Sequence, residues 1–241
     1  MELIFLICIL IAAVLYSSVG HGGASGYLAL MAIFSFPPEL MKVTALTLNL
    51  FVASIAFFAF YKAGHFKFKL LWPFVITSVP FSFLGGLIDV EPKLYKIILG
   101  ICLLFATFRI FYKHNPEEEK CNEVQLVIAL VIGALLGFFS GLIGIGGGII
   151  LSPLLLLLKW GNLKEVAAVS AVFIFLNSAS GLFGHFLRDV TINPNVSLYI
   201  IAGVLGGIIG GNMGSFKFSN QRLSYFLAFV LFIASIKLFL V

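Results

Sequence analysis

Two glycine clusters interrupt long apolar stretches of the chain. Residues 20–23 read Gly-His-Gly-Gly and residues 144–148 read Gly-Ile-Gly-Gly-Gly, inside stretches 3–38 and 124–158 that contain no Asp, Glu, Lys or Arg. A lipid-facing helix gains nothing from a broken backbone, whereas an intramembrane substrate site uses the N–H groups that a break leaves without partners. The clusters begin 124 residues apart in a chain of 241. The pattern therefore predicts a duplicated membrane transporter whose site lies where the two breaks meet.

The composition excludes a water-soluble domain. Hydrophobic residues make up 61% of the chain, charged residues 10%, and the mean hydropathy is +1.14, whereas soluble domains carry about 25% charged residues. We expect a multi-pass integral membrane protein in a lipid bilayer, with the bacterial inner membrane as its location. The acidic start Met1-Glu2 does not resemble a cleavable signal, so the first apolar stretch is interpreted as a membrane helix. No basic patch suggests a nucleic-acid partner.

Charged residues divide the chain into about eight apolar spans of membrane-helix length. The predicted fold class is an all-α membrane protein of two homologous four-helix repeats, each with a glycine-rich broken or re-entrant helix. Residues 1–113 form the first repeat, 114–122 a polar linker, and 123–241 the second repeat. The expected helices are 3–19, a short helix 27–36, 43–61, 70–88 and 94–111, then 124–143, a short helix 149–158, 166–187, 196–216 and 223–240.

The relation between the repeats depends on what the chain does at each break. If the chain crosses the membrane through the breaks, four spans per half relate the repeats in parallel, which is the arrangement we favour. If the chain turns back, the number of crossings per half becomes odd and the repeats are inverted. Lysine and arginine are balanced between the two sides, so the side of the N-terminus stays open, as does the oligomeric state.

Glycines at four-residue spacing form three further stripes, interpreted as surfaces for close helix packing. The stripes are residues 133, 137 and 141, residues 203, 207 and 211, and residues 206, 210 and 214.

Each glycine break is expected to form an anion cradle made of backbone. A helix that begins at mid-membrane leaves its first N–H groups unpaired and points its positive end inward, and glycine lets a ligand come close. The alternative is a kink that only packs against neighbouring helices. The candidate binding residues at the breaks are Gly22, Gly23, Ser25, Gly146, Gly147 and Gly148, with Ser152 as a further hydroxyl donor.

Side chains near the breaks add neutral donors to this predicted site. Every Asp and Glu lies at a terminus or a segment edge, which argues against a metal-cation substrate and favours an anion. His21 is the titratable group inside a break, where it donates to the anion, takes up a proton, or simply bonds a carbonyl. A proton or sodium is the candidate coupling ion. The polar residues of the following spans are Thr47, Asn49, Ser170, Asn177 and Ser178, which either contact the anion or hold helices together.

These motifs resemble those of the sulfite exporter TauE/SafE family of membrane permeases. The residues that carry the resemblance are 20–26 (Gly-His-Gly-Gly-Ala-Ser-Gly), 141–148 leading to Pro153, and 177–185, which ends in Gly184-His185. The resemblance implies a secondary transporter of small anions such as sulfite, other sulfur oxyanions or organosulfonates, working by alternating access. His185 itself is expected at the membrane interface rather than in an aqueous vestibule.

The sequence contains no hydrolytic or redox constellation, no metal-ligand spacing and no Walker-type loop. We therefore expect no enzyme activity, no metal and no cofactor, with transport driven by gradients. Two alternatives stay open: a passive anion channel, and a membrane enzyme or scaffold subunit that uses its glycines only for packing.

Overall fold

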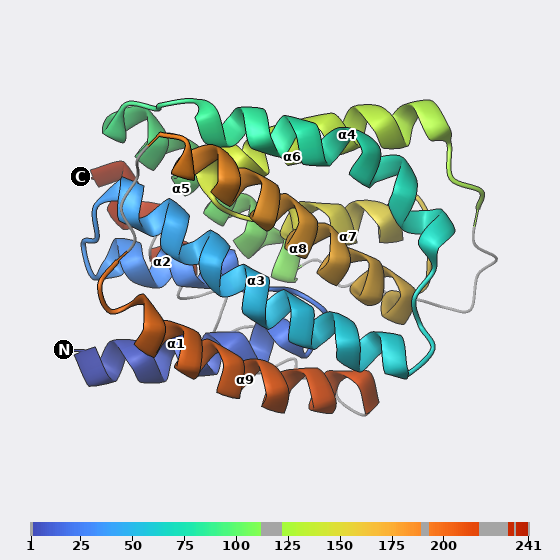
Figure 1. Cartoon of the computed structure of the whole chain (residues 1–241), viewed down its shortest axis with the longest axis horizontal. Coiled ribbons are helices and arrows are strands. Elements are labelled where there is room, and N and C mark those ends of the chain that lie inside the picture. Colours follow the sequence, from blue (N-terminus) through green and yellow to red (C-terminus); the bar gives the residue numbers. More distant parts are fainter. Residues whose placement is uncertain (1, 112–121, 189–192, 217–230, 234, 241) are drawn as a thin grey trace.

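The structure, a computed structural model, describes residues 2–111, 122–188, 193–216, 231–233 and 235–240. These residues form helices joined by short loops and contain no strand (Figure 1). The labelled helices are α1 (Glu2–Ser17), α2 (Ala24–Ile33), α3 (Pro38–Lys62), α4 (Phe68–Leu87), α5 (Pro92–Phe111), α6 (Leu126–Ile143), α7 (Gly148–Leu157), α8 (Leu163–Phe186) and α9 (Val196–Phe216). Residues 231–233 and 235–240 are also helical. The predicted linker 114–122 lies, apart from Asn122, outside the described residues.

Five described helices, α3, α4, α6, α8 and α9, are long and apolar enough to cross a membrane. Each of them exposes large apolar side chains on the outer surface, such as Phe58, Ile76, Val127, Phe183 and Ile201. In water such a surface would be unstable, whereas acyl chains cover it without cost. The expectation of an integral membrane protein is thus confirmed. The described helices do not confirm eight crossings, because α1, α2 and α7 have only 16, 10 and 10 residues.

The chain turns back at the first glycine break, so that α1 and α2 form a helical hairpin. Near the turn, the hydroxyls of Tyr16 and Ser25 lie 2.6 Å apart. At the open end, the rings of Phe5 at the start of α1 and Phe34 just after α2 lie 5.0 Å apart. The short helix begins directly after Gly23, so Ser25 lies inside α2 and not in the break as predicted.

The second glycine break makes the same turn between α6 and α7. The backbone N–H of Asn122, which precedes α6, donates to the carbonyl of Lys159, which follows α7, over 2.7 Å. Figure 1 shows α7 running in the direction opposite to α6, as α2 runs in the direction opposite to α1. The order of long helix, turn, ten-residue helix and long helix therefore occurs twice in the chain.

The two copies of this pattern run in opposite directions. α3 and α8, which follow the hairpins, are antiparallel neighbours: Leu46 contacts Gly181, Asn49 contacts Ser178, and Phe60 packs with Ala167. Our preference for parallel repeats is therefore wrong. Parallel repeats require the chain to cross at each break, and both breaks instead return it to the side from which it came (Figure 1).

Two of the three glycine stripes are confirmed as sites of close helix packing. A Cβ on Gly137 of α6 would lie 2.1 Å from the carbonyl oxygen of Ser78 on α4, and one on Gly210 of α9 would lie 2.1 Å from that of Val14 on α1. Backbones this close leave room only for hydrogen. The third stripe is looser, since a Cβ on Gly207 would make ordinary contacts at 3.5 Å.

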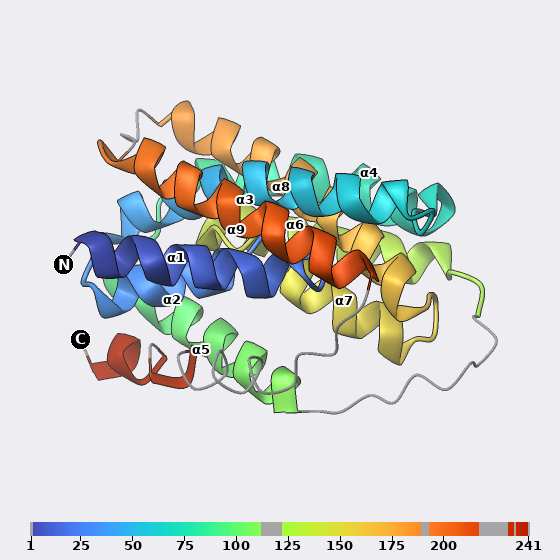
Figure 2. The same cartoon turned by 90° about the horizontal axis from the view of Figure 1, so that it is seen from below.

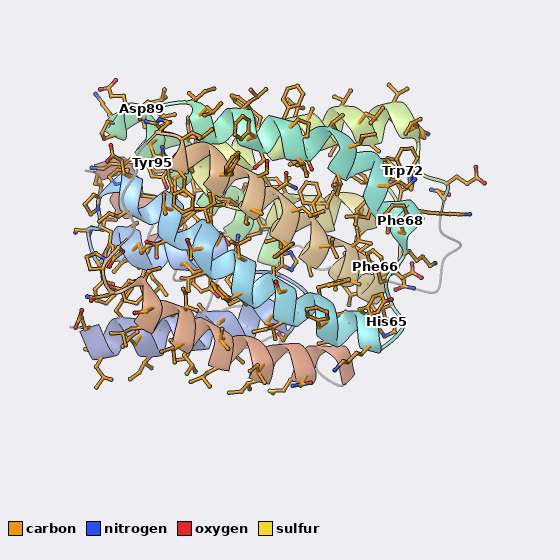
Figure 3. The ribbon with its side chains drawn as sticks, viewed as in Figure 1. His65, Phe66, Phe68, Trp72, Asp89 and Tyr95 are labelled. Atoms are coloured by element: carbon orange, nitrogen blue, oxygen red, sulfur yellow. The ribbon has the colours of Figure 1, made fainter. Side chains whose placement is uncertain are left out.

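The two ends of the bundle are marked by aromatic and charged side chains (Figure 3). Phe66, Phe68 and Trp72 lie at the end where α3 meets α4, as interfacial aromatic residues do. Asp89 lies at the opposite end, 2.6 Å from the Arg188 guanidinium. This hydrogen bond holds the pKa of the Asp89 carboxyl below its usual value, so the pair is ionised at neutral pH.

Candidate functional site

Asn49 of α3 lies between the two glycine turns. Its Oδ1 accepts a hydrogen bond from the N–H of Ala24, the first residue of α2, over 3.1 Å, and its Nδ2 donates to Ser178 Oγ over 3.2 Å. A Cβ on Gly22 would lie 2.4 Å from Asn49 Oδ1, and one on Gly146 would lie 2.5 Å from Asn49 Nδ2. Both turns therefore touch one fully buried amide, and segments 124 residues apart meet inside the bundle.

Ile174 of α8 is the apolar counterpart of Asn49. Cβ atoms on Gly22 and Gly146 would lie 3.0 and 3.1 Å from its Cγ2, and one on Gly148, the first residue of α7, would lie 2.3 Å from its Cδ1. Asn49, at the start of α2, therefore accepts a hydrogen bond from the helix backbone, whereas Ile174, at the start of α7, cannot accept one. Ile174 was not among the predicted site residues, because an isoleucine inside an apolar span does not differ from its neighbours in the sequence.

Backbone N–H groups at the start of α7 have no hydrogen-bond acceptor among the described residues. Gly23 and Gly147, which precede α2 and α7, both adopt left-handed backbone conformations with φ of 99° and 74°, and as glycines they supply no side-chain cap to their own helices. The N–H groups of Gly147 and Gly148 make no hydrogen bond within the described part of the chain. The positive end of the α7 dipole thus points into the interior without a neutralising partner.

A chain of three polar side chains joins the first turn to the second hairpin. The ring of His21, which is 4% exposed, has Nδ1 2.9 Å from the carbonyl oxygen of Val19 and Nε2 3.0 Å from Ser152 Oγ on α7. Ser152 Oγ in turn lies 2.7 Å from Ser170 Oγ on α8. A carbonyl only accepts, so Nδ1 carries the hydrogen and Nε2 of the neutral ring accepts from Ser152.

Other predicted site residues are engaged elsewhere. The hydroxyl of Ser25 bonds Tyr16 of α1, and Thr47 donates to the carbonyl of Val43 in its own helix over 2.7 Å. Asn177 Nδ2 donates to Ser78 Oγ on α4 over 3.0 Å, so this amide joins α8 to α4. The structure thus brings His21, Gly22, Gly146, Gly148, Asn49, Ser170 and Ser178 together around the turns. Ser25 and Asn177 instead join neighbouring helices, and Thr47 bonds within its own helix.

His185 lies near the end of α8, and other helices enclose it. Its side chain is 1% exposed, and its Nε2 lies 2.9 Å from the carbonyl oxygen of Gly141 on α6. Because α8 packs closely against α6 at Gly141, the ring is enclosed between helices, and its expected place at the membrane interface stays a prediction. Among the residues that the structure describes, no group of three or more His, Cys, Asp or Glu side chains is arranged to hold a metal ion.

Comparison with known proteins identifies the family. The family model "Sulfite exporter TauE/SafE" matches residues 5–238. The chain belongs to this family. It is 34% identical to the probable membrane transporter protein y4hK of Sinorhizobium fredii over 96% of both chains. It is 30% identical to a probable membrane transporter protein of Methanocaldococcus jannaschii, over 74% of this chain and 70% of the relative. No solved structure matches the chain.

The family match and the names of these relatives indicate that this TauE/SafE protein is a membrane transporter. The match covers both glycine turns and all the labelled helices from residue 5 onward. The residues around Asn49 therefore lie in the interior of a membrane transporter.

Proposed function

We propose that this TauE/SafE protein is a secondary transporter of a small sulfur oxyanion, with sulfite as the first candidate, in the bacterial cell membrane. The observation that carries the proposal is the meeting of the two glycine turns on Asn49. The name of the matching family supports sulfite as the substrate. In the proposal, the oxyanion accepts hydrogen bonds from the N–H groups of Gly147 and Gly148 and from the hydroxyls nearby.

Inverted hairpins suit alternating access. The α1–α2 hairpin opens toward one end of the bundle and the α6–α7 hairpin toward the other (Figure 2). We infer that residues 1–113 and 123–241 are two inverted repeats. Since the closest backbone contacts join α1 to α9 and α4 to α6, the bodies that rock are the α1–α9 pair and the α4–α6 pair, about the crossing of α3 and α8 at Asn49 and Ile174. Rocking in one direction exposes the anion to one side of the membrane, and rocking back exposes it to the other.

Gly22→Ala tests the site with little disturbance of the backbone. Gly22 has no positive φ, so alanine adds no backbone strain, but its Cβ would lie 2.4 Å from Asn49 Oδ1 and must displace the amide. We expect the KM for sulfite to rise about 5- to 150-fold, as the loss of hydrogen bonds worth about 1–3 kcal/mol implies. The measurement is radiolabelled sulfite counterflow in proteoliposomes.

Gly207→Ala is the matched control for this substitution. Its Cβ would make only ordinary contacts, at 3.5 Å from Ile55 and Val52, so its flux should equal that of the wild type. Equal KM values for the wild type, Gly22→Ala and Gly207→Ala would show that the first glycine turn does not take part in sulfite binding. Flux without saturation or counterflow would identify a channel instead of a carrier.

His21 is the proposed carrier of a coupling proton. When the ring binds a proton, Nε2 becomes a donor, and the hydroxyls of Ser152 and Ser170 must reverse to accept and pass on this bond. The titratable ring beside His21 is that of Tyr16 on α1, with centroids 6.5 Å apart. A protonated His21 adds one positive charge to the proposed anion site.

His21→Gln should separate transport from coupling. Glutamine still forms hydrogen bonds but carries no charge. We expect a pH gradient to drive sulfite accumulation by the wild type, and the variant to lose accumulation while it keeps counterflow. Accumulation by the variant equal to that of the wild type would show that the proton travels elsewhere or that another ion is coupled.

A further inference from the structure

Lys42 of α3 is a buried lysine that has no counter-ion among the described residues. The residue is 3% exposed, and its Nζ lies 4.6 Å from the centroid of the Tyr95 ring. Within the described residues its ammonium makes no ion pair and no hydrogen bond. Burying an unpaired charge costs desolvation free energy, and the attraction between the ammonium and the face of the Tyr95 ring offsets only part of it.

The carboxylates near Lys42 do not neutralise it. The charged groups that act on it are Arg188, Asp89 and Glu39. Asp89 is bonded to Arg188 at 2.6 Å and its side chain is 72% exposed, while Glu39 is exposed at the first turn of α3. Neither lies within ion-pair distance of the ammonium, so Lys42 has no direct counter-ion among the described residues.

Lys42 lies between the end of the bundle and the glycine turns. It precedes Asn49 by about two turns of α3, or about 10 Å along the helix, on the same face. Both residues contact the second turn: a Cβ on Gly144 would lie 2.9 Å from Lys42 Cα, and Gly146 contacts Asn49. Figure 3 shows Tyr95 and Asp89 at the end of the bundle where α3 begins. An ion moving from this end toward Asn49 along α3 would pass the ammonium.

Among the described residues, no cation occupies the equivalent position beside the opposite hairpin. Gly20 occupies in the first turn the place that Gly144 has in the second, and a Cβ on Gly20 would lie 2.5 Å from the carbonyl oxygen of Ala167 on α8. Ala167 of α8 therefore has the position beside the first turn that Lys42 of α3 has beside the second turn. The two halves share their backbone arrangement but differ in charge at this position.

We propose that Lys42 forms a staging site for a small oxyanion, on the face of the membrane where α3 begins. The site attracts the anion from water and passes it to the glycine turns, and the opposite face has no equivalent. The inference rests on the proposed function, because it assumes that the central site binds an anion. It adds a second binding position and a difference in apparent affinity between the two faces.

Lys42→Met tests the staging site in proteoliposomes that hold the protein in a single orientation. We expect the KM for sulfite from the α3 N-terminal face to rise by about tenfold or more at low ionic strength, and the KM from the other face to stay unchanged. The difference should shrink as salt is added, because ions screen the charge. Lys42→Arg, which keeps the charge, should retain most of the wild-type affinity. Lys93→Met removes an exposed lysine from the same end of the bundle and serves as the control.

Thermal unfolding in detergent separates binding from a structural role. Removing an unpaired buried charge should raise the Tm of Lys42→Met above that of the wild type. Sulfite should raise the Tm of the wild type more than that of the variant. A lower Tm with unchanged KM would show that Lys42 only supports the fold, and would overturn the proposal.

The transport results also distinguish the two proposals. Unchanged KM values from both faces, or equal increases from both faces, would overturn the staging site while leaving sulfite transport intact. If the wild type moves no sulfur oxyanion at all, the proposed function fails, and the staging site fails with it.

Discussion

Asn49→Leu should abolish saturable sulfite transport while the protein still folds into the membrane. Leucine matches asparagine roughly in size but leaves the Ala24 N–H and the Ser178 hydroxyl without their partner. Each buried polar group left unpaired costs about 1–3 kcal/mol. The two turns would then lose the side chain that both of them contact, and the positions of the first N–H groups of α2 and α7 would no longer be fixed. Counterflow in proteoliposomes measures the loss, and thermal unfolding in detergent measures the accompanying fall in stability.

Two further variants make this prediction specific. Asn212→Leu replaces an exposed asparagine on α9 whose Nδ2 bonds the carbonyl of Ile208 in its own helix, and it should transport as the wild type does. Asn49→Asp keeps the acceptor for Ala24 but places a carboxylate beside the proposed anion site, so its KM should rise sharply. Saturable transport by Asn49→Asp with an unaltered KM would mean that the anion binds away from Asn49.

The sequence was sufficient to predict that the glycine breaks meet, but not in which direction the chain leaves them. A ten-residue apolar segment such as α2 has the same hydropathy whether it continues across the membrane or returns. The deciding contacts, between Phe5 and Phe34 and between Asn122 and Lys159, join residues that no local pattern connects. The preference for parallel repeats failed for this reason.

The sequence shows that polar residues occur inside the apolar helices, but it does not show which of them face the glycine turns. Asn49 and Asn177 are both fully buried amides in long apolar helices, and the sequence treats them alike. Asn49 faces the glycine turns, whereas Asn177 faces Ser78 on α4. Only the packing of α3 and α8 distinguishes them. Lys42 was missed because its position after Glu39 and Pro38 resembles an ordinary helix start at a membrane edge.

The glycines fall into two groups that substitutions should separate. Those of the turns, such as Gly146 and Gly147, have positive φ and hold the breaks open, whereas those of α6 and α9 are helical and let backbones touch. Changes in the first group should impair binding directly. Changes in the second should act on the whole bundle, because α4 and α6 pack along most of their lengths.

Gly137→Ala should therefore strongly destabilise the protein, although alanine in place of glycine inside a helix is normally favourable by about 0.5–1 kcal/mol. The new Cβ would lie 2.1 Å from the Ser78 carbonyl oxygen, which is backbone and cannot rotate away, so α6 must move from α4. Overpacking of this kind typically costs about 1–3 kcal/mol. Gly210→Ala on α9 should lower the Tm in detergent similarly, since its Cβ meets the Val14 carbonyl oxygen at the same distance of 2.1 Å. Gly207→Ala, on the looser stripe of the same helix, should leave the Tm unchanged or higher. A common Tm for all three variants would contradict the backbone contacts on which the inverted arrangement of the helices depends.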